Sequence, residues 1–495
     1  MFAVVPALRV NRVNDQPFRP EGRHVLYWMI ASRRTRWSFG LQHAMNRAAE
    51  MGKPLIVLEA LRIGYRWASP RVHRFIIDGM HDNQARFADT NIAYHPYVEP
   101  AAGHGKGLLQ ALAADACCVV TDEFPCFFLP KMVAAAGAKL TVACEQIDGN
   151  GLLPLRVADK TFAAAVHFRR FLQRELPRHL EAMPKDDPLT RAHELQPATI
   201  PSAISERWPA VPLAVLDGSD HSFLAGLAID QEVPPVPFAG GEAAGRSAIE
   251  VFMRKKLSHY PEARNQPEQD VASGFSPYLH FGHISVHDVV SRIFRRDGWT
   301  LDKLGTRPTG SREGWWGLSP ESEAFIDELV TWREVGYNFC FTRPDDYDQW
   351  ESLPEWAKKS LDKHIDDDRP VLYDRKALEA GRTYDALWNA AQRQLVVEGR
   401  IHNYLRMLWA KKVLEWSETP RDALATLIEL NNRWSIDGRD PNSYSGIFWC
   451  FGRYDRPWPP ERNIYGIIRT MSSDNTAKKV KVKGYIQRWL RPGLL

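Results

Sequence analysis

The stretch HVLYWMI, residues 24–30, decides the fold of the first part of the chain. It is a short apolar run typical of a buried strand, and the segment after it has helical spacing and ends at Gly52, a common C-terminal residue of helices. A second apolar run, PLIVLEAL at 54–61, follows directly. Strands that alternate with helices are joined by right-handed crossovers, so this pattern predicts a parallel sheet.

The alternation continues along the chain. Helical patterns at 71–89 and 107–116 separate three more strand-like runs, at 91–98, at 117–124 and in the segment that begins KLTVACEQID at Lys139. The sequence therefore predicts a doubly wound parallel sheet of the Rossmann-like α/β type. The fingerprint G-x-G-x-x-G does not follow the first strand, so an ordinary dinucleotide site is not expected there.

Long helical patterns replace the strands from Arg246 onward. They are predicted at 246–257, 283–295, 320–341, 385–398, 400–416 and 421–432. Thirteen of the 17 tryptophans lie from Trp299 onward, and the turn-rich segment 295–320 is expected to be a mobile loop. The sequence thus predicts an α/β plus all-α protein with an N-terminal extension (1–20), an α/β domain (21–185), a proline-rich linker (186–245) and a helical domain (246–495).

Composition and charge describe a globular protein without a membrane span. Charged residues make up 25% and hydrophobic residues 44% of the 495 residues, and the net charge is +4. The six cysteines have no spacing typical of a metal site, so we expect a reducing compartment and no metal. Neither a signal peptide nor an apolar run of ~20 residues is present, so we expect a cytoplasmic, nucleoid-associated or nuclear location and no secretion.

Candidate site residues lie in four stretches of the helical half. These stretches are SGFSPYLHFGHIS (273–285), EAFIDELVTWRE (323–334), EGRIHNYLRMLWAKKVLEW (398–416) and NNRWSIDGRDPNSYSGIFW (431–449). Each alone has a structural explanation: a helix N-cap, a surface acid beside a core tryptophan, a core histidine, and a series of Asx turns. No single stretch therefore establishes a function.

The order and spacing of these stretches, together with ALWNAAQ at 386–392, resemble the photolyase/cryptochrome family, and specifically its class II cyclobutane pyrimidine dimer photolyases. The resemblance covers nearly the whole chain and implies that the helical domain binds FAD, active in its reduced form. It implies a carbon–carbon lyase that repairs DNA: reduced FAD, excited by blue or near-UV light, donates an electron to a flipped-out cyclobutane pyrimidine dimer and splits it into monomers.

The resemblance also assigns residues to the FAD site. Tyr260 and the segment Ser273, Gly274, Phe275 and Ser276 are expected to line it, with the SPYL segment cradling the phosphates. Gly274 departs from the family, which usually has a longer polar or basic residue there. Arg406 is expected to pair with Asp437 near the isoalloxazine, and Asn431 to face the flavin N5, where an amide can both donate and accept.

A lesion pocket and a DNA surface follow from the same resemblance. The pocket is expected to contain Glu328, Trp332, Asn403, Met407 and Trp449, with Glu328 donating to a pyrimidine carbonyl and the two tryptophans holding the dimer. Arg456 and Arg469 resemble residues that enter or flank the gap left in the duplex. The lysines that could add phosphate contacts are Lys478, Lys479, Lys481 and Lys483.

A tryptophan chain is the last feature implied. Trp388, Trp409 and Trp416 resemble the chain through which class II enzymes reduce their flavin by light, and Trp409 and Trp416 are seven residues apart on one helix. An antenna chromophore, an 8-HDF-type deazaflavin or a folate, is expected in the N-terminal domain without a motif that decides between them. The expected partner is DNA containing UV-induced pyrimidine dimers, with the protein a monomer and no obligate protein partner.

Two related functions compete with dimer repair. A cryptochrome-type blue-light photoreceptor shares the fold and the FAD but typically has a changed residue facing N5, whereas Asn431 is in place here. A (6-4) photolyase is expected to carry histidines at the lesion-facing positions, whereas this chain has Asn403 and Met407. A non-catalytic flavoprotein or nucleic-acid-binding module does not explain why Glu328, Trp332 and Trp449 occur together.

Overall fold

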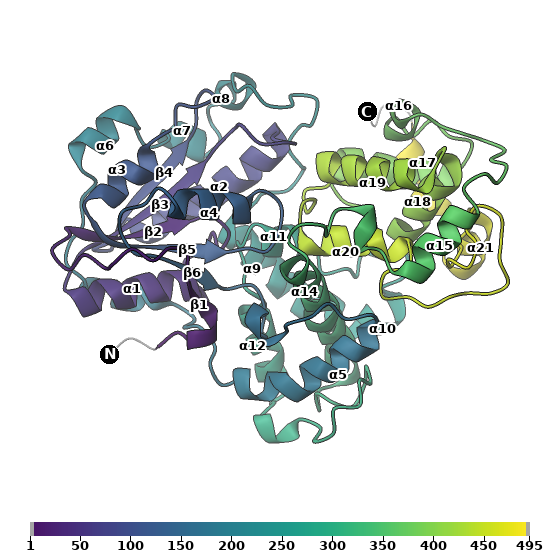
Figure 1. Ribbon diagram of the computed structural model, residues 1–495, viewed down its shortest axis with the longest axis horizontal. Helices are drawn as coiled ribbons and strands as arrows, with labels where there is room; N and C mark the ends of the chain where they lie inside the picture. Colours follow the sequence, from purple (N-terminus) through teal and green to yellow (C-terminus); the bar gives the residue numbers. More distant parts are fainter. Residues whose placement is uncertain (1–3, 492–495) are drawn as a thin grey trace. The chain divides into compact units, whose positions relative to one another are not determined.

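A six-stranded sheet is the centre of the first of two units in the structure, a computed structural model that describes residues 4–491 (Figure 1). The strand order is β1-β6-β5-β2-β3-β4. All neighbouring strands run parallel except β1, which pairs antiparallel with β6 at the edge. The strands are β1 (Val10–Arg12), β2 (His24–Met29), β3 (Leu55–Leu61), β4 (Ala93–Val98), β5 (Ala116–Glu123) and β6 (Cys144–Asp148).

The two units are not contiguous in sequence. The first comprises Met1–Ala158, Glu175–Glu250 and Gly274–Asp302, and the second comprises the rest, Asp159–Arg174, Val251–Ser273 and Lys303–Leu495. The sequence predicts two contiguous domains joined by one linker. The chain instead crosses between units several times.

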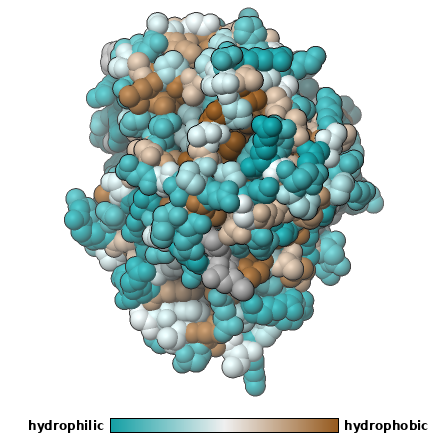
Figure 2. All heavy atoms as spheres, turned by 90° about the vertical axis from the view of Figure 1, so that its left-hand side faces the viewer, coloured by the Kyte–Doolittle hydropathy of each residue, from teal (hydrophilic) through white to brown (hydrophobic). Residues whose placement is uncertain are grey.

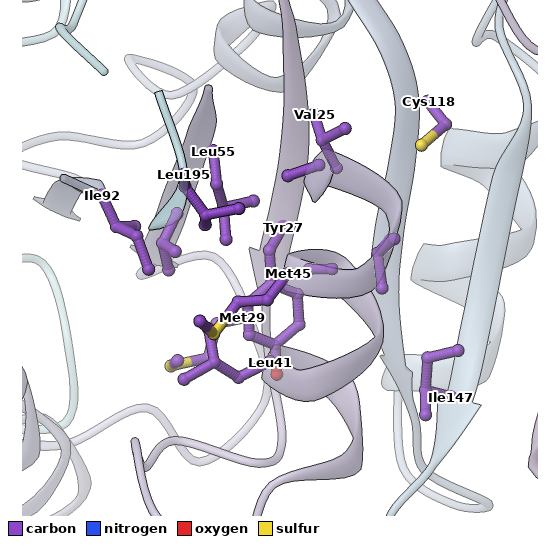
Figure 3. Packing of buried hydrophobic residues seen from close by; sticks show 14 of the residues in the cluster. Val25, Tyr27, Met29, Leu41, Met45, Leu55, Ile92, Cys118, Ile147 and Leu195 are labelled. Carbon is purple, nitrogen blue, oxygen red and sulfur yellow. The ribbon is translucent and has the colours of Figure 1, made fainter. Parts of the chain in front are cut away.

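Helices cover both faces of the sheet, as the alternation of strands and helices predicted. Alternate residues of β2 show this directly, because Val25, Tyr27 and Met29 pack with α1 while Leu26 and Trp28 pack with α3 and α4. Figure 3 shows the α1 side of this core. The helices of this unit are α1 (Phe39–Met51), α2 (Pro70–Phe87), α3 (Leu108–Ala114), α4 (Leu129–Gly137), α6 (Ser202–Arg207), α7 (Leu213–Leu216), α8 (Ser222–Ala225), α9 (Gly241–Val251), α11 (Ser276–His280) and α12 (Val286–Arg296).

Helix ends and the linker follow local rules. Ser38 caps α1 by accepting a hydrogen bond from the Leu41 N–H, and Gly52 ends the helix with the positive φ of 62° that its position predicted. The segment predicted as a linker contributes to the core, since Leu195 packs on one face of the sheet and Trp208 on the other. The segment is therefore part of the first unit rather than a linker outside its core.

A buried carboxylate, that of Asp122, lies where doubly wound sheets usually bind ligands. It lies at the carboxyl ends of β2 and β5, between which the strand order reverses. There the Asp122 carboxylate accepts hydrogen bonds from the backbone N–H groups of residues 30, 31 and 32 at 2.8–2.9 Å, and from the Tyr27 hydroxyl at 2.7 Å. The carboxylate thus satisfies three backbone N–H groups of the loop that follows β2.

The second unit consists of helices. They are α5 (Ala165–Glu175), α10 (Tyr260–Ala263), α13 (Pro320–Ile326), α14 (Arg333–Thr342), α15 (Glu355–Lys363), α16 (Arg375–Glu379), α17 (Ala386–Glu398), α18 (Asn403–Trp416), α19 (Pro420–Trp434), α20 (Pro441–Cys450), α21 (Ser473–Lys479) and α22 (Lys483–Leu490). The helix predicted at 320–341 is interrupted by a π-helical segment, Asp327–Trp332, between α13 and α14.

The surface carries few large apolar side chains. The face in Figure 2 is mostly hydrophilic, and its apolar residues form small scattered patches. Within residues 4–491, no helix combines the length and apolar character needed to cross a membrane.

Removing the Asp122 carboxylate tests how much its hydrogen bonds stabilise the first unit. Asp122→Ala leaves three N–H groups and the Tyr27 hydroxyl without their acceptor, so we expect the free energy of unfolding of the first unit to fall by about 3 kcal/mol or more. Urea denaturation measures this loss. Asp115→Ala is the control, because Asp115 makes only an exposed ion pair with Arg23, and equal effects of the two changes would contradict the assignment.

Candidate functional site

A cavity of about 290 Å³ lies inside the second unit. Side chains from the π-helical segment, α18, α19 and α20 line it, although these elements are far apart in sequence. Eight residues that the sequence singled out meet at its wall: Glu328, Trp332, Asn403, Arg406, Met407, Trp409, Asn431 and Trp449. The fold therefore brings together the predicted lesion pocket and the flavin-facing residues Arg406 and Asn431.

The π-helical segment supplies one wall of the cavity. Such segments are rare in helices and occur frequently at functional sites. Here the segment is fixed from behind, since the buried guanidinium of Arg169 donates to both carboxylate oxygens of Asp327 at 2.7 and 2.9 Å. Glu328 and Trp332 belong to the same segment and line the cavity.

Glu328 has a cationic neighbour that the sequence did not reveal. Arg264 donates from Nη1 to Glu328 Oε1 at 2.8 Å, and Arg264 follows directly after the short helix α10. Desolvation raises the pKa of the Glu328 carboxyl, while the charge of Arg264 acts in the opposite direction. The net direction is upward, so the site favours a protonated Glu328 more than water does.

Trp332 and Trp449 stack directly on each other. Their ring centroids are 4.6 Å apart and the planes differ by 13°. Close approach of α14 and α20 makes this possible, because a Cβ on Gly336 would lie 2.6 Å from Asn442 Oδ1. The two rings that were expected to hold a lesion thus contact one another in this structure.

Arg406 and Asn431 form a polar part of the cavity wall, and Asp437 lies beside Arg406. Asn431 is 3% exposed and accepts a hydrogen bond from Arg406 Nη1 at 3.4 Å. Arg406 Nη2 also lies 3.6 Å from Asp437 Oδ1, which is the pairing expected from the sequence. This part of the wall therefore presents a cation and an amide that can donate or accept, with the Asp437 carboxylate beside the cation.

Asn431 is held in place by the turn that follows α19. The buried Arg439 guanidinium donates to the backbone carbonyls of Asn432, Ser435 and Ile436 at the C-terminal end of α19. Gly438 packs tightly against the same end, since a Cβ there would lie 2.7 Å from the Asn431 carbonyl oxygen. These contacts explain why the stretch 431–449 needs a glycine and an arginine at these positions.

The three tryptophans of the predicted chain are buried and in contact. Trp409 lines the cavity, and its ring lies 6.5 Å from that of Trp388 with an interplanar angle of 7°. Trp388 in turn lies 5.4 Å from Trp416, and its Nε1 donates to the Trp409 carbonyl. Trp416 is only 1% exposed, but it contacts Tyr384, which is 62% exposed.

The remaining predicted residues lie away from the cavity wall. Tyr260 packs against Phe325 in the second unit. The predicted segment 273–276 is divided, because Ser273 belongs to the second unit and residues 274–276 belong to the first. Arg456 and Arg469 are exposed and place their guanidinium groups 4.2 and 5.1 Å from the ring centroid of Trp458. The lysines predicted to contact phosphates are also exposed: Lys478, Lys479, Lys481 and Lys483.

Several wall residues were not predicted from the sequence. They are Asn265, Arg312, Asn442, Ser445 and Tyr454. No local pattern marks them, because each reaches the cavity only through the packing of its segment. Within the part of the chain that the structure describes, no cluster of three or more His, Cys, Asp or Glu could hold a metal ion.

Arg439→Ala tests whether the capped end of α19 stabilises this wall. The change removes a buried cation and leaves three carbonyls without its hydrogen bonds, so we expect the free energy of unfolding of the second unit to fall by about 3 kcal/mol. Thermal or urea unfolding measures the loss. Arg421→Ala, at the exposed beginning of α19, is the control, and a loss no larger than the control's would refute the role of Arg439.

The chain is similar over almost its full length to proteins named deoxyribodipyrimidine photo-lyase. It is 32% identical over 486 residues to one from Methanothermobacter thermautotrophicus, covering 98% of each chain. Identity is 32% to one from Oryza sativa (97% of this chain, 89% of the relative) and 30% to one from Potorous tridactylus (94% and 81%). No protein-family model matches the chain.

Solved structures of low sequence identity share the fold. A class III photolyase from Agrobacterium tumefaciens aligns with a TM-score of 0.64 at 20% identity, covering 94% of this chain and 86% of that one. A cryptochrome from Synechocystis aligns with a TM-score of 0.67 at 14% identity, covering 94% and 88%. At these identities the likeness supports the architecture of an α/β part and a helical part, and nothing finer.

Proposed function

The chain belongs to the DNA photolyase family, and we propose that it uses the cavity of its second unit to split cyclobutane pyrimidine dimers in DNA with light. Its activity is light-driven DNA repair. The observation that carries the proposal is the cavity itself, which gathers the Glu328 carboxyl, two indoles and the Asn431–Arg406 pair from four helical elements. The relatives from a plant and a marsupial are consistent with class II.

FAD is the cofactor that we propose for this cavity. Arg406 and Asn431 in the wall offer a cation and an amide, with Asp437 beside Arg406, which suits a planar heterocycle with both donors and acceptors. The wall also has room, since a Cβ on Gly446 would meet no atom within 4 Å. Reduced FAD, when bound and excited by light, supplies the electron that opens the cyclobutane ring and takes it back afterwards.

The chain's own residues bind and orient the dimer. In its protonated form, which desolvation favours, Glu328 donates a hydrogen bond to a pyrimidine carbonyl, where negative charge accumulates. Trp332 and Trp449 provide the apolar surface for the flipped bases, with Met407 beside them. Photolyases are known to extrude their target, and a dimer costs less to extrude than a normal pair because it is already poorly stacked.

The buried tryptophans form a proposed route for electrons to the cavity. Trp409 stands at the cavity wall, Trp388 contacts both of its partners, and Trp416 lies at the far end beside Tyr384. The contacts are short and the rings are shielded from water. The antenna pigment expected in the first unit, a deazaflavin or a folate, stays a prediction.

A repair assay tests the proposed function. Purified flavin-containing protein, with the flavin chemically reduced, is mixed with dimer-containing DNA and either illuminated with blue light or kept dark. We expect dimers to disappear only in the light. Persistence of the dimers under light would overturn the proposal.

Matched variants in the same assay test the cavity. Glu328→Ala removes the proposed hydrogen-bond donor, so we expect repair under light to fall by about tenfold or more. Glu313→Ala changes an exposed acid of the same unit and should leave repair unchanged. Equal repair by both variants would remove Glu328 from the mechanism.

Trp388→Phe tests the electron route separately from repair. Phenylalanine preserves an aromatic ring but is far harder to oxidise, so we expect photoreduction of oxidised flavin to be abolished while chemically reduced protein still repairs dimers. Absorption spectroscopy during illumination follows the reduction. Trp434→Phe, another buried tryptophan outside the route, should reduce normally; normal photoreduction in Trp388→Phe would place the route elsewhere.

A further inference from the structure

The loop 303–319 is held on both sides of residue 312 by side chains of the second unit. Gln173 accepts a hydrogen bond from the backbone N–H of residue 310 at 2.7 Å and donates to the carbonyl of residue 311 at 2.9 Å. Glu323 accepts three backbone N–H bonds from the segment 314–317, at 2.6–3.2 Å. The sequence predicted a mobile loop here, whereas these contacts fix its backbone on either side of residue 312.

Arg312 projects from this anchored loop to the cavity. It is exposed, yet it lines the cavity wall, and its Cζ lies 6.0 Å from the ring centroid of Trp332. Its charge also reaches Glu328, whose pKa it helps to lower against the dominant effect of desolvation. Arg312 is therefore a cation at the mouth of the cavity, beside one of the indoles proposed to hold the dimer.

Each of three other arginines around the cavity has a carboxyl group as its partner. Arg264 pairs with Glu328 at 2.8 Å, and Arg406 lies 3.6 Å from Asp437. Arg169, which also approaches Trp332, is paired with Asp327. Within residues 4–491, by contrast, the Arg312 side chain forms neither an ion pair nor a hydrogen bond. It has the free charge that an anionic ligand at the mouth requires.

We propose that Arg312 is a specificity-determining residue that binds a backbone phosphate of the flipped dinucleotide and thereby favours dimer-containing DNA. This inference rests on the proposed function. Two linked bases cannot enter a cavity without bringing the phosphate between them, and those beside it, to the mouth. A guanidinium suits this anion because it can donate two parallel hydrogen bonds to phosphate oxygens. Undamaged DNA keeps its bases stacked and presents no phosphate at this place.

Binding measurements with full-length, flavin-containing protein in the dark test the proposal. The probes are a fluorescent duplex with one thymine dimer and the same duplex without damage, each titrated at several salt concentrations. For Arg312→Ala we expect Kd for the damaged duplex to rise about tenfold, and the salt dependence of that binding to weaken by about one phosphate contact. Kd for the undamaged duplex should change by less than about twofold.

Two further variants make the result decisive. Arg312→Lys keeps the charge and should retain the salt dependence while losing part of the affinity. Arg307→Ala removes an exposed arginine of the same loop that does not line the cavity, and should leave Kd for the damaged duplex unchanged. Equal losses for Arg307→Ala and Arg312→Ala, or equal losses on both duplexes, would overturn the role of Arg312. Equal binding of both duplexes by the unaltered protein would instead overturn the proposed function.

Discussion

The contact between the Arg439 guanidinium and the end of α19 determines the geometry of the cavity. The last carbonyls of a helix lack partners within it, and here a buried cation binds the carbonyls of Asn432 in the last turn, of the C-cap Ser435 and of Ile436 just beyond it, where the helix dipole is negative. Arg439 itself has a φ of 66°, so the turn bends back onto the helix. Gly438 allows that close return. Because the turn is fixed, Asn431 before it and Asp437 within it face Arg406 from two sides.

The pKa of Glu328, in the π-helical segment of the cavity wall, depends on a balance of two electrostatic effects. Burial disfavours a charged Glu328, and Arg264 at 2.8 Å favours it. Desolvation is the larger effect, so the pKa rises although a cation is adjacent. An arginine in this position still matters, because it limits the rise and orients the carboxyl toward the cavity. Desolvation thus favours the protonated form of Glu328, and Arg264 opposes it.

Sequence patterns predicted what depends on local order. Parallel strands buried on both faces appear as continuous apolar runs, which is why 24–30 was recognisable as a strand. The edge strand β1 (Val10–Arg12) was missed because it is short and half polar, with no alternation to mark it. The π-helical segment has no sequence signal, and the Arg264–Glu328 pair joins residues 64 positions apart. The family motifs supplied most of the cavity wall, whereas its cationic mouth required the tertiary structure.

The stacked indoles raise the question of how a dimer finds room between them. An aromatic pair such as Trp332 and Trp449 contributes about 0.5–1.5 kcal/mol beyond the burial of its area. Stacking of a nucleic-acid base on an aromatic side chain contributes about 1–3 kcal/mol per base. In the proposed function, contacts between the indoles and the two linked bases replace the contact between the indoles. The main cost lies in extruding the nucleotides, which is lowest for a damaged, poorly stacked pair. In the proposed function, selectivity for damaged DNA then comes from this difference in cost and needs no contact that reads the sequence.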